Sequence, residues 1–263
     1  MKVTVNGISI NYETTGHGPN VVLIHGSPDN LTMWQHQIEA LSARYRVTAY
    51  DMRGFGQTPF GDIEYRLSTL VDDLRGLIET LQLTRPVVVG YSLGGWVAAT
   101  FAVTNPELIR ALVLTGCSGA MPRPSSELTN RQKKVVELLG KCDIKGLAKD
   151  MANWCFSPGF REKNPAEYQR YVNIKASNRL ENLARIMGGG RGFPIQLPFE
   201  KITCPTLFIA GEYDSAAPVE SQRQAHQLTS GSKFVVLPAG HASMLELPEE
   251  FNTALLQFLD NLR

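Results

Sequence analysis

The first part of the chain alternates hydrophobic and polar positions in two short segments, residues 2–5 and 8–13. Asn6-Gly7 separates them, and this dipeptide is the strongest short signal for a two-residue β-hairpin turn. Uninterrupted apolar runs then alternate with helical patterns, an order that predicts a mostly parallel sheet of buried strands. The predicted strands are 21–24, 46–50, 86–89 and 111–114, and the helical patterns lie near 31–43, 68–82 and 92–104.

The pattern changes between residues 121 and 200, where helix-like segments such as 131–139 and 168–187 occur without a convincing strand. Strand patterns return at 206–210 and 234–237, and a last helix is predicted over 249–262. We therefore expect an α/β core formed by 1–120 and 201–263, with 121–200 inserted as a helical cap. The sheet should be twisted and mostly parallel, with an antiparallel hairpin at its N-terminal end.

Composition limits the classes of partner. The chain has 263 residues, is 43% hydrophobic and carries a formal charge of +1, which gives none of the basic excess of nucleic-acid-binding proteins. No segment resembles a signal peptide or a membrane span, so we expect a cytoplasmic protein without a membrane partner, as a monomer or homodimer. The four scattered cysteines predict reduced thiols and no metal site. Small molecules are the expected partners.

Ser92 stands within Gly90-x-Ser92-x-Gly94, between a predicted buried strand and a helical pattern. A strained strand-to-helix turn at this place would expose the serine hydroxyl above the sheet edge, as a nucleophile elbow does. The alternative is a serine that only caps the helix. By itself the five-residue motif is a weak signal, so the assignment depends on a base and a carboxylate elsewhere in the chain.

His241 and Asp214 both follow predicted strands and are the candidates for those two roles. His241 lies in the short loop after the strand at 234–237, at the sheet edge where Ser92 should emerge. We predict that it is the general base, and that Asp214 orients its imidazole. Glu212 is the nearest rival to Asp214 for the orienting role. The alternative for His241 and for Asp214 is that each is an ordinary loop residue without a catalytic role. The order serine, aspartate, histidine is the one that this sheet architecture imposes.

Two backbone N–H groups should stabilise the oxyanion, those of Ser27 and Leu93. Ser27 belongs to the loop after the strand at 21–24, and Leu93 follows the serine. The alternative for His25-Gly26 is a tight strand-to-helix turn, and for His25 itself we expect a role in bracing the loop rather than in carrying a proton. Packing is the default interpretation for Trp34, and we expect Asp51 and Arg53 to pair locally. The candidate substrate contacts are His25, Tyr91, Trp34 and Trp154.

Together these motifs resemble those of the α/β-hydrolase superfamily. They are His25-Gly26, Asp51-x-Arg53-Gly54-x-Gly56, Gly90-x-Ser92-x-Gly94-Gly95, Gly211-x-x-Asp214, and Gly240-His241 followed by Leu247-Pro248-Glu249. Within the superfamily the chain is similar to small esterases and lactonases, including the 3-oxoadipate enol-lactonase group. That resemblance implies a serine triad of Ser92, Asp214 and His241, no metal or cofactor, and hydrolysis of an ester or lactone through an acyl-enzyme. Epoxide hydrolases and dehalogenases are also similar, but they use an aspartate where this chain has Ser92.

Two other functions stay open on the same residues. One is C–C bond hydrolysis or cofactor-free perhydrolysis of the haloperoxidase kind. The other is a ligand-binding receptor with vestigial hydrolysis. Residues 121–200 carry 14 Lys and Arg against 8 Asp and Glu, a charge of +6, whereas the rest carries 12 against 17, or −5. This basic cap either attracts anionic substrates or is an ordinary solvated surface.

Overall fold

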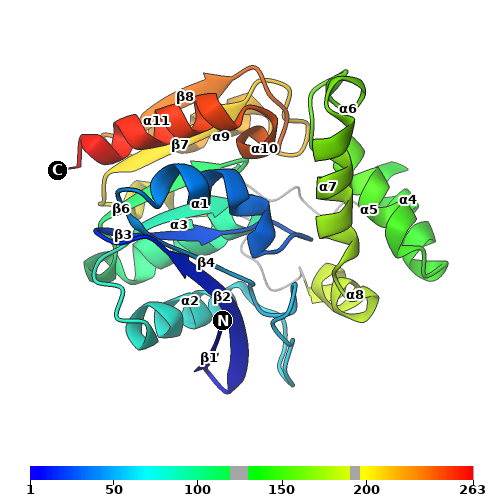
Figure 1. Ribbon diagram of the computed structural model, residues 1–263, viewed down its shortest axis with the longest axis horizontal. Helices are drawn as coiled ribbons and strands as arrows, with labels where there is room; N and C mark the ends of the chain where they lie inside the picture. The colour runs from blue at the N-terminus through cyan, green and yellow to red at the C-terminus, as the bar shows by residue number, and fades with distance from the viewer. Residues whose placement is uncertain (119–129, 190–195, 263) are drawn as a thin grey trace.

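The computed structural model describes residues 1–118, 130–189 and 196–262. Its centre is an eight-stranded sheet in the order β1-β2-β4-β3-β5-β6-β7-β8 (Figure 1). The first two strands pair antiparallel, β2 is antiparallel to β4, and all other neighbours are parallel. The predicted α/β sheet with an antiparallel N-terminal hairpin is thus confirmed. The strands are β1 Lys2–Val5, β2 Ile8–Thr15, β3 Asn20–Ile24, β4 Arg46–Tyr50, β5 Val87–Tyr91, β6 Ala111–Thr115, β7 Thr206–Gly211 and β8 Lys233–Leu237.

The turn between β1 and β2 has the conformation that its sequence demands. Asn6 and Gly7 both have positive φ, 47° and 77°. A two-residue hairpin turn of type I′ has positive φ at both positions, which matches the twist of the strands, and Asn-Gly tolerates it best. The two turn residues alone therefore account for the predicted hairpin.

Helices cover both faces of the sheet, and alternate residues of each buried strand point into two separate cores. In β3, Val22 and Ile24 belong to one core, while Val21 and Leu23 belong to the other. Both faces being apolar explains why the strands are continuous hydrophobic runs. The helices outside the insertion are α1 Gln35–Leu41, α2 Leu67–Thr80, α3 Leu93–Thr104, α9 Val219–Leu228, α10 Ser243–Glu246 and α11 Pro248–Asp260, with short 3₁₀ turns η1 Leu31–Trp34, η2 Pro106–Leu108 and η4 Phe199–Lys201.

Between β6 and β7 the described residues include five α-helices that stand together to one side of the sheet, drawn in green in Figure 1. We call α4–α8 the helical insertion. Its helices are α4 Asn130–Gly140, α5 Ile144–Asn153, α6 Phe160–Lys163, α7 Pro165–Ala176 and α8 Leu180–Gly189. The single helical segment predicted over 168–187 is wrong, because α7 ends at Ala176 and α8 begins at Leu180. The Asn178 side chain in this break bonds the backbone carbonyls of Ile174 in α7 and of Pro28 in the loop after β3.

Two expectations from composition can be compared with the described part of the chain. All four cysteines are free thiols, as predicted, with Cys117 and Cys155 buried. In the described residues, no helix combines the length and the apolar character needed to cross a membrane.

Candidate active site

Ser92 lies at a sharp turn between β5 and α3 and has φ 51° and ψ −113°. Positive φ in a non-glycine residue is strained, typically by about 1–3 kcal/mol, so the surrounding structure must enforce it. The flanking glycines permit this. A Cβ on Gly94 would come 2.5 Å from the His25 carbonyl oxygen, and one on Gly90 would come 2.7 Å from the Gly95 Cα. The elbow geometry predicted from the motif is present, and Ser92 itself is partly exposed.

His241 and Asp214 are joined by a hydrogen bond of 2.8 Å between the imidazole Nδ1 and Oδ2 of the carboxylate. Their side chains are 4% and 0% exposed. The other carboxylate oxygen, Oδ1, accepts the backbone N–H groups of Ala216 and Ala217, each at 2.8 Å. These bonds fix the carboxylate plane. Because Nδ1 donates its proton to Asp214, Nε2 of His241 is left as the proton acceptor.

The ends of β5 and β6 bring Ser92 and His241 to one edge of the sheet. The Ser92 N–H bonds the Thr115 carbonyl at 3.0 Å. The next residue, Gly116, packs on the imidazole so closely that a Cβ there would lie 2.8 Å from the His241 Cε1. Among the described residues, no hydrogen bond joins the Ser92 hydroxyl to His241. Such bonds commonly tighten only when substrate is bound.

The two predicted oxyanion donors lie on neighbouring segments. Leu93 is the first residue of α3, where a backbone N–H has no partner within the helix. Ser27 is in the loop 25–30, whose turn is held by the Gly26 carbonyl. That oxygen accepts the Asp29 N–H at 3.1 Å and is 2.7 Å from the His25 Nδ1. The elbow touches the start of this loop through Gly94.

Among the candidate substrate contacts, His25 braces two loops. It is fully buried; one ring nitrogen bonds the Gly26 carbonyl and the other accepts the Met52 N–H at 3.0 Å. Burial lowers the pKa of His25 below its ordinary value, which favours the neutral ring that these bonds require. Trp34 is fully buried among hydrophobic side chains, as its default interpretation expected.

Tyr91 and Trp154 lie beside the candidate base. Their ring centroids are 4.9 and 5.9 Å from that of His241. Tyr91 is buried, and its hydroxyl is 3.3 Å from that of Tyr171 in α7. Trp154 comes from the helical insertion and is partly exposed. The structure thus brings these two predicted residues to the site and leaves Trp34 in the core.

The expected pairing of Asp51 with Arg53 is wrong. The Arg53 guanidinium makes two hydrogen bonds of 2.7 Å to Asp73, and both side chains are buried. Asp51 instead accepts the backbone N–H groups of Leu31 and Gln57, each at 2.8 Å. Asp73 falls among the buried residues of α2. A carboxylate on the apolar face of a helix indicates that a buried cation lies opposite it, because a buried charge needs a partner.

The sequence does not predict a role for three charged residues near the site. Asp29 and Lys175 form a buried ion pair between the loop 25–30 and α7. Glu246 accepts the Gly240 N–H at 2.8 Å and the Ser157 N–H at 3.0 Å, which ties the loop before His241 to the helical insertion. No spacing rule links Asp29 to Lys175 or Ser157 to Glu246, which lie 146 and 89 residues apart. Within residues 1–118, 130–189 and 196–262, no group of three or more His, Cys, Asp or Glu could hold a metal ion.

Known proteins match this chain over both its sheet and its helical insertion. A family model described as alpha/beta hydrolase fold matches residues 19–248. A 2-hydroxy-6-oxo-6-(2'-aminophenyl)hexa-2,4-dienoic acid hydrolase from Metapseudomonas resinovorans is 31% identical, with 98% of this chain and 89% of that protein aligned. The 3-oxoadipate enol-lactonase 2 of Acinetobacter baylyi is 27% identical over 96% of this chain and 94% of its own. The crystal structure of the enol-lactonase from Burkholderia xenovorans LB400 superposes with a TM-score of 0.90 at 25% identity, covering 99% and 100% of the two chains. The similarity therefore includes the helical insertion.

Proposed function

The chain belongs to the α/β hydrolase family, and on that premise we propose that it hydrolyses carboxylic esters or lactones through an acyl-enzyme intermediate. The observation that carries the proposal is the arrangement at one sheet edge. Ser92 stands at a strained elbow, and the neighbouring loop presents an imidazole whose Nδ1 bonds a buried carboxylate at 2.8 Å. The similarity to two enol-lactonases supports a lactone or ester as the substrate class.

In this mechanism the Ser92 hydroxyl attacks the substrate carbonyl while Nε2 of His241 takes its proton. Asp214 stabilises the imidazolium and keeps Nδ1 protonated. The N–H groups of Ser27 and Leu93 hold the oxyanion. His241 then returns the proton to the leaving oxygen, and water, activated by the same base, hydrolyses the acyl-enzyme.

We propose the helical insertion as the cap of this site. Trp154 approaches the ring of His241, and α7 contacts the loop that carries Ser27. Both contacts support a wall of the substrate site formed by the insertion. The charge of +6 on residues 121–200 supports a substrate that carries a carboxylate, because a cation-rich wall raises the local concentration of anions.

The second candidate is hydrolysis of a C–C bond with the same residues. The 31% identical relative is named as a dienoic acid hydrolase, and it aligns with 98% of this chain. Its name supports a substrate with a free acid as well, so both candidates predict an anionic substrate.

Purified protein should be tested on p-nitrophenyl acetate and butyrate, on a panel of lactones with and without a carboxylate, and on a 2-hydroxy-6-oxodienoate. We expect multiple turnover of an ester or lactone, reduced at least about 10³-fold by Ser92→Ala. A fluorophosphonate should label the wild type and not the variant. Turnover of the dienoate alone would establish the second candidate. Equal activity in the wild type and Ser92→Ala would refute both.

A further inference from the structure

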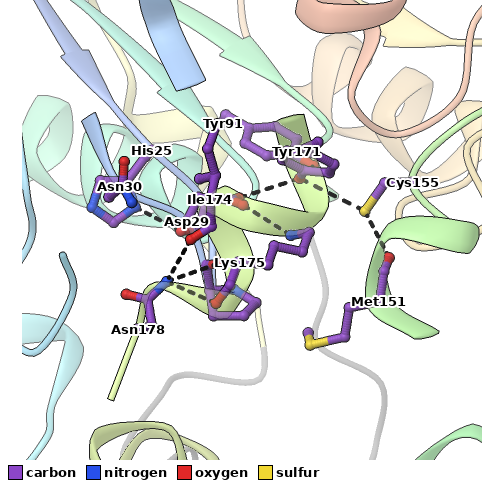
Figure 2. Close-up of polar contacts among 12 residues, drawn as sticks. His25, Asp29, Asn30, Tyr91, Met151, Cys155, Tyr171, Ile174, Lys175 and Asn178 are labelled. Atoms are coloured by element: carbon purple, nitrogen blue, oxygen red, sulfur yellow. Dashed lines mark hydrogen bonds and ion pairs between the residues drawn. The ribbon is translucent and has the colours of Figure 1, made fainter. Parts of the chain in front are cut away.

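A buried ion pair connects the helical insertion to the loop that precedes η1. The Lys175 Nζ lies 2.9 Å from Oδ1 of Asp29 (Figure 2), and each side chain is 1% exposed. Lys175 is in the last turn of α7, and Asp29 follows Ser27 by two residues. The two partners are 146 residues apart in sequence.

The pair is embedded in further polar contacts that lead toward Ser92. The Tyr171 hydroxyl donates to Oδ2 of Asp29 at 3.4 Å, and the Lys175 Nζ lies 4.3 Å from the centroid of the Tyr171 ring. The same hydroxyl is 3.3 Å from that of Tyr91, the residue directly before Ser92. Figure 2 shows these side chains converging between α7 and the loop 25–30.

Each of three successive loop residues has a partner at the end of α7 or just beyond it. The Pro28 carbonyl accepts the Asn178 side-chain amide at 3.2 Å, Asp29 binds Lys175, and the Asn30 amide donates to the Ser177 hydroxyl at 3.0 Å. The ring of Tyr91 in β5 also packs on this loop, since a Cβ on Gly26 would lie 2.8 Å from two of its carbons. Residues 26–30 are thus held between α7 and β5.

Stability alone is a weak reason for burying two charges, because desolvation offsets most of their attraction and an apolar pair often stabilises as well or better. What a buried ion pair with satisfied hydrogen bonds does supply is a fixed, directional geometry. Here that geometry is imposed on the segment directly after Ser27.

We propose that Asp29 and Lys175 are positioning residues, which hold the loop 25–30 from the helical insertion so that the Ser27 N–H points at the reaction site. The catalytic consequence rests on the proposed function, in which Ser27 supplies one oxyanion donor. An oxyanion donor acts in the transition state, and complete loss of one typically lowers kcat about 10²–10³-fold. A displaced donor should therefore lower kcat and leave KM nearly unchanged.

The test compares Lys175→Met, Asp29→Asn and the double variant Asp29→Asn/Lys175→Met with the wild type. Kinetics on the best ester, thermal unfolding midpoints, and hydrogen–deuterium exchange of the peptide over residues 25–30 are measured for each. Asn182→Ala is the matched control. It removes another buried bond between the insertion and the core, from the Asn182 amide to the Gly54 carbonyl at 2.9 Å, and the hydrogen bonds of Asn182 within the described residues do not reach residues 25–30.

We expect each single variant to lower kcat about 10–100-fold with KM changed less than about 3-fold. Exchange of residues 25–30 should become faster, whereas Asn182→Ala should change neither kcat nor this exchange. The double variant leaves no unpaired charge, so its midpoint should recover. Its kcat should stay at the level of the single variants, because both changes remove the same link.

The proposal is overturned if kcat of the double variant recovers together with its midpoint, since the pair would then only balance charge. Unchanged exchange of residues 25–30 in all three variants would overturn it too. The proposed function fails by a different result, the absence of turnover in the wild type or its persistence in Ser92→Ala. The exchange measurement reports on the loop in either case.

Discussion

Asp214→Asn tests the candidate triad most directly, because the structure determines how the new amide must lie. In the wild type, Oδ1 of Asp214 accepts two backbone N–H groups, from Ala216 and Ala217, each at 2.8 Å. Only the carbonyl oxygen of an asparagine can replace Oδ1 there, since an NH₂ group would face two donors. The NH₂ group therefore takes the position of Oδ2, which bonds Nδ1 of His241.

This orientation reverses the hydrogen bond to the imidazole. The amide N–H donates to Nδ1, so the neutral ring must carry its proton on Nε2 and cannot accept one from Ser92. In a serine protease triad the same change lowers kcat by about 10⁴. That factor corresponds to about 5.4 kcal/mol of transition-state stabilisation. We expect a loss of this size here, with KM changed little because substrate binding does not need the base.

The assay is steady-state hydrolysis of p-nitrophenyl butyrate near neutral pH, with folding checked by the thermal midpoint. Glu212→Gln is the matched control, because it makes the same carboxylate-to-amide change two residues earlier, at an exposed side chain. Its kcat should stay within about 2-fold of the wild type. A loss below about 10-fold in folded Asp214→Asn would refute the reasoning, as would an equal loss in Glu212→Gln.

Two further predictions concern the framework of the site. Gly94→Ala should destabilise the fold by about 1–3 kcal/mol or more, because its Cβ would lie 2.5 Å from the His25 carbonyl oxygen and only backbone movement relieves that contact. Thermal unfolding measures this loss against the control Gly140→Ala, whose Cβ meets nothing within 4 Å. Equal unfolding midpoints of the two variants would contradict the prediction. Burial lowers the pKa of His25 in the folded state, so the unfolded chain binds the extra proton first as the pH falls below 6.5, the ordinary pKa of a histidine. The free energy of unfolding should keep its full value above that pH. Below it, this free energy should decline by up to about 1.4 kcal/mol per pH unit until the pH reaches the folded-state pKa of His25. Urea unfolding at pH 7.5, 6.5 and 5.5 measures the slope, and an undiminished slope in His25→Gln would assign it to other groups.

The parts of the fold that the sequence predicts are those fixed by neighbouring residues. The Asn6-Gly7 turn needs only its own backbone conformations, and the parallel strands are recognisable because both of their faces are buried. The elbow at Ser92 is predictable for the same reason, since its glycines and the strand before it are contiguous. Asp214 and His241 are found by their places after two strands, and the structure joins them by a hydrogen bond.

What the sequence does not predict depends on partners distant along the chain. The apolar pattern runs through residues 168–187, yet α7 stops at Ala176, and Asn178 in the break bonds the Pro28 carbonyl. A contact across 150 residues leaves no periodicity to detect. The pairing of Arg53 with Asp73 is similar, because the local spacing favoured Asp51 and only the burial of α2 brings Asp73 to the guanidinium.

The contacts of the helical insertion make it part of the framework of the candidate site. The loop with Ser27 is bonded to α7 through Asp29 and Lys175. The loop with His241 is bonded to the turn after α5, where the Cys155 carbonyl accepts the Ala242 N–H at 2.8 Å and Glu246 joins the Gly240 and Ser157 N–H groups. Buried polar bonds are directional, and a partner left alone is costly. A change at either side of these contacts therefore has to be matched across the interface, which couples the sequence of the insertion to the geometry of both loops.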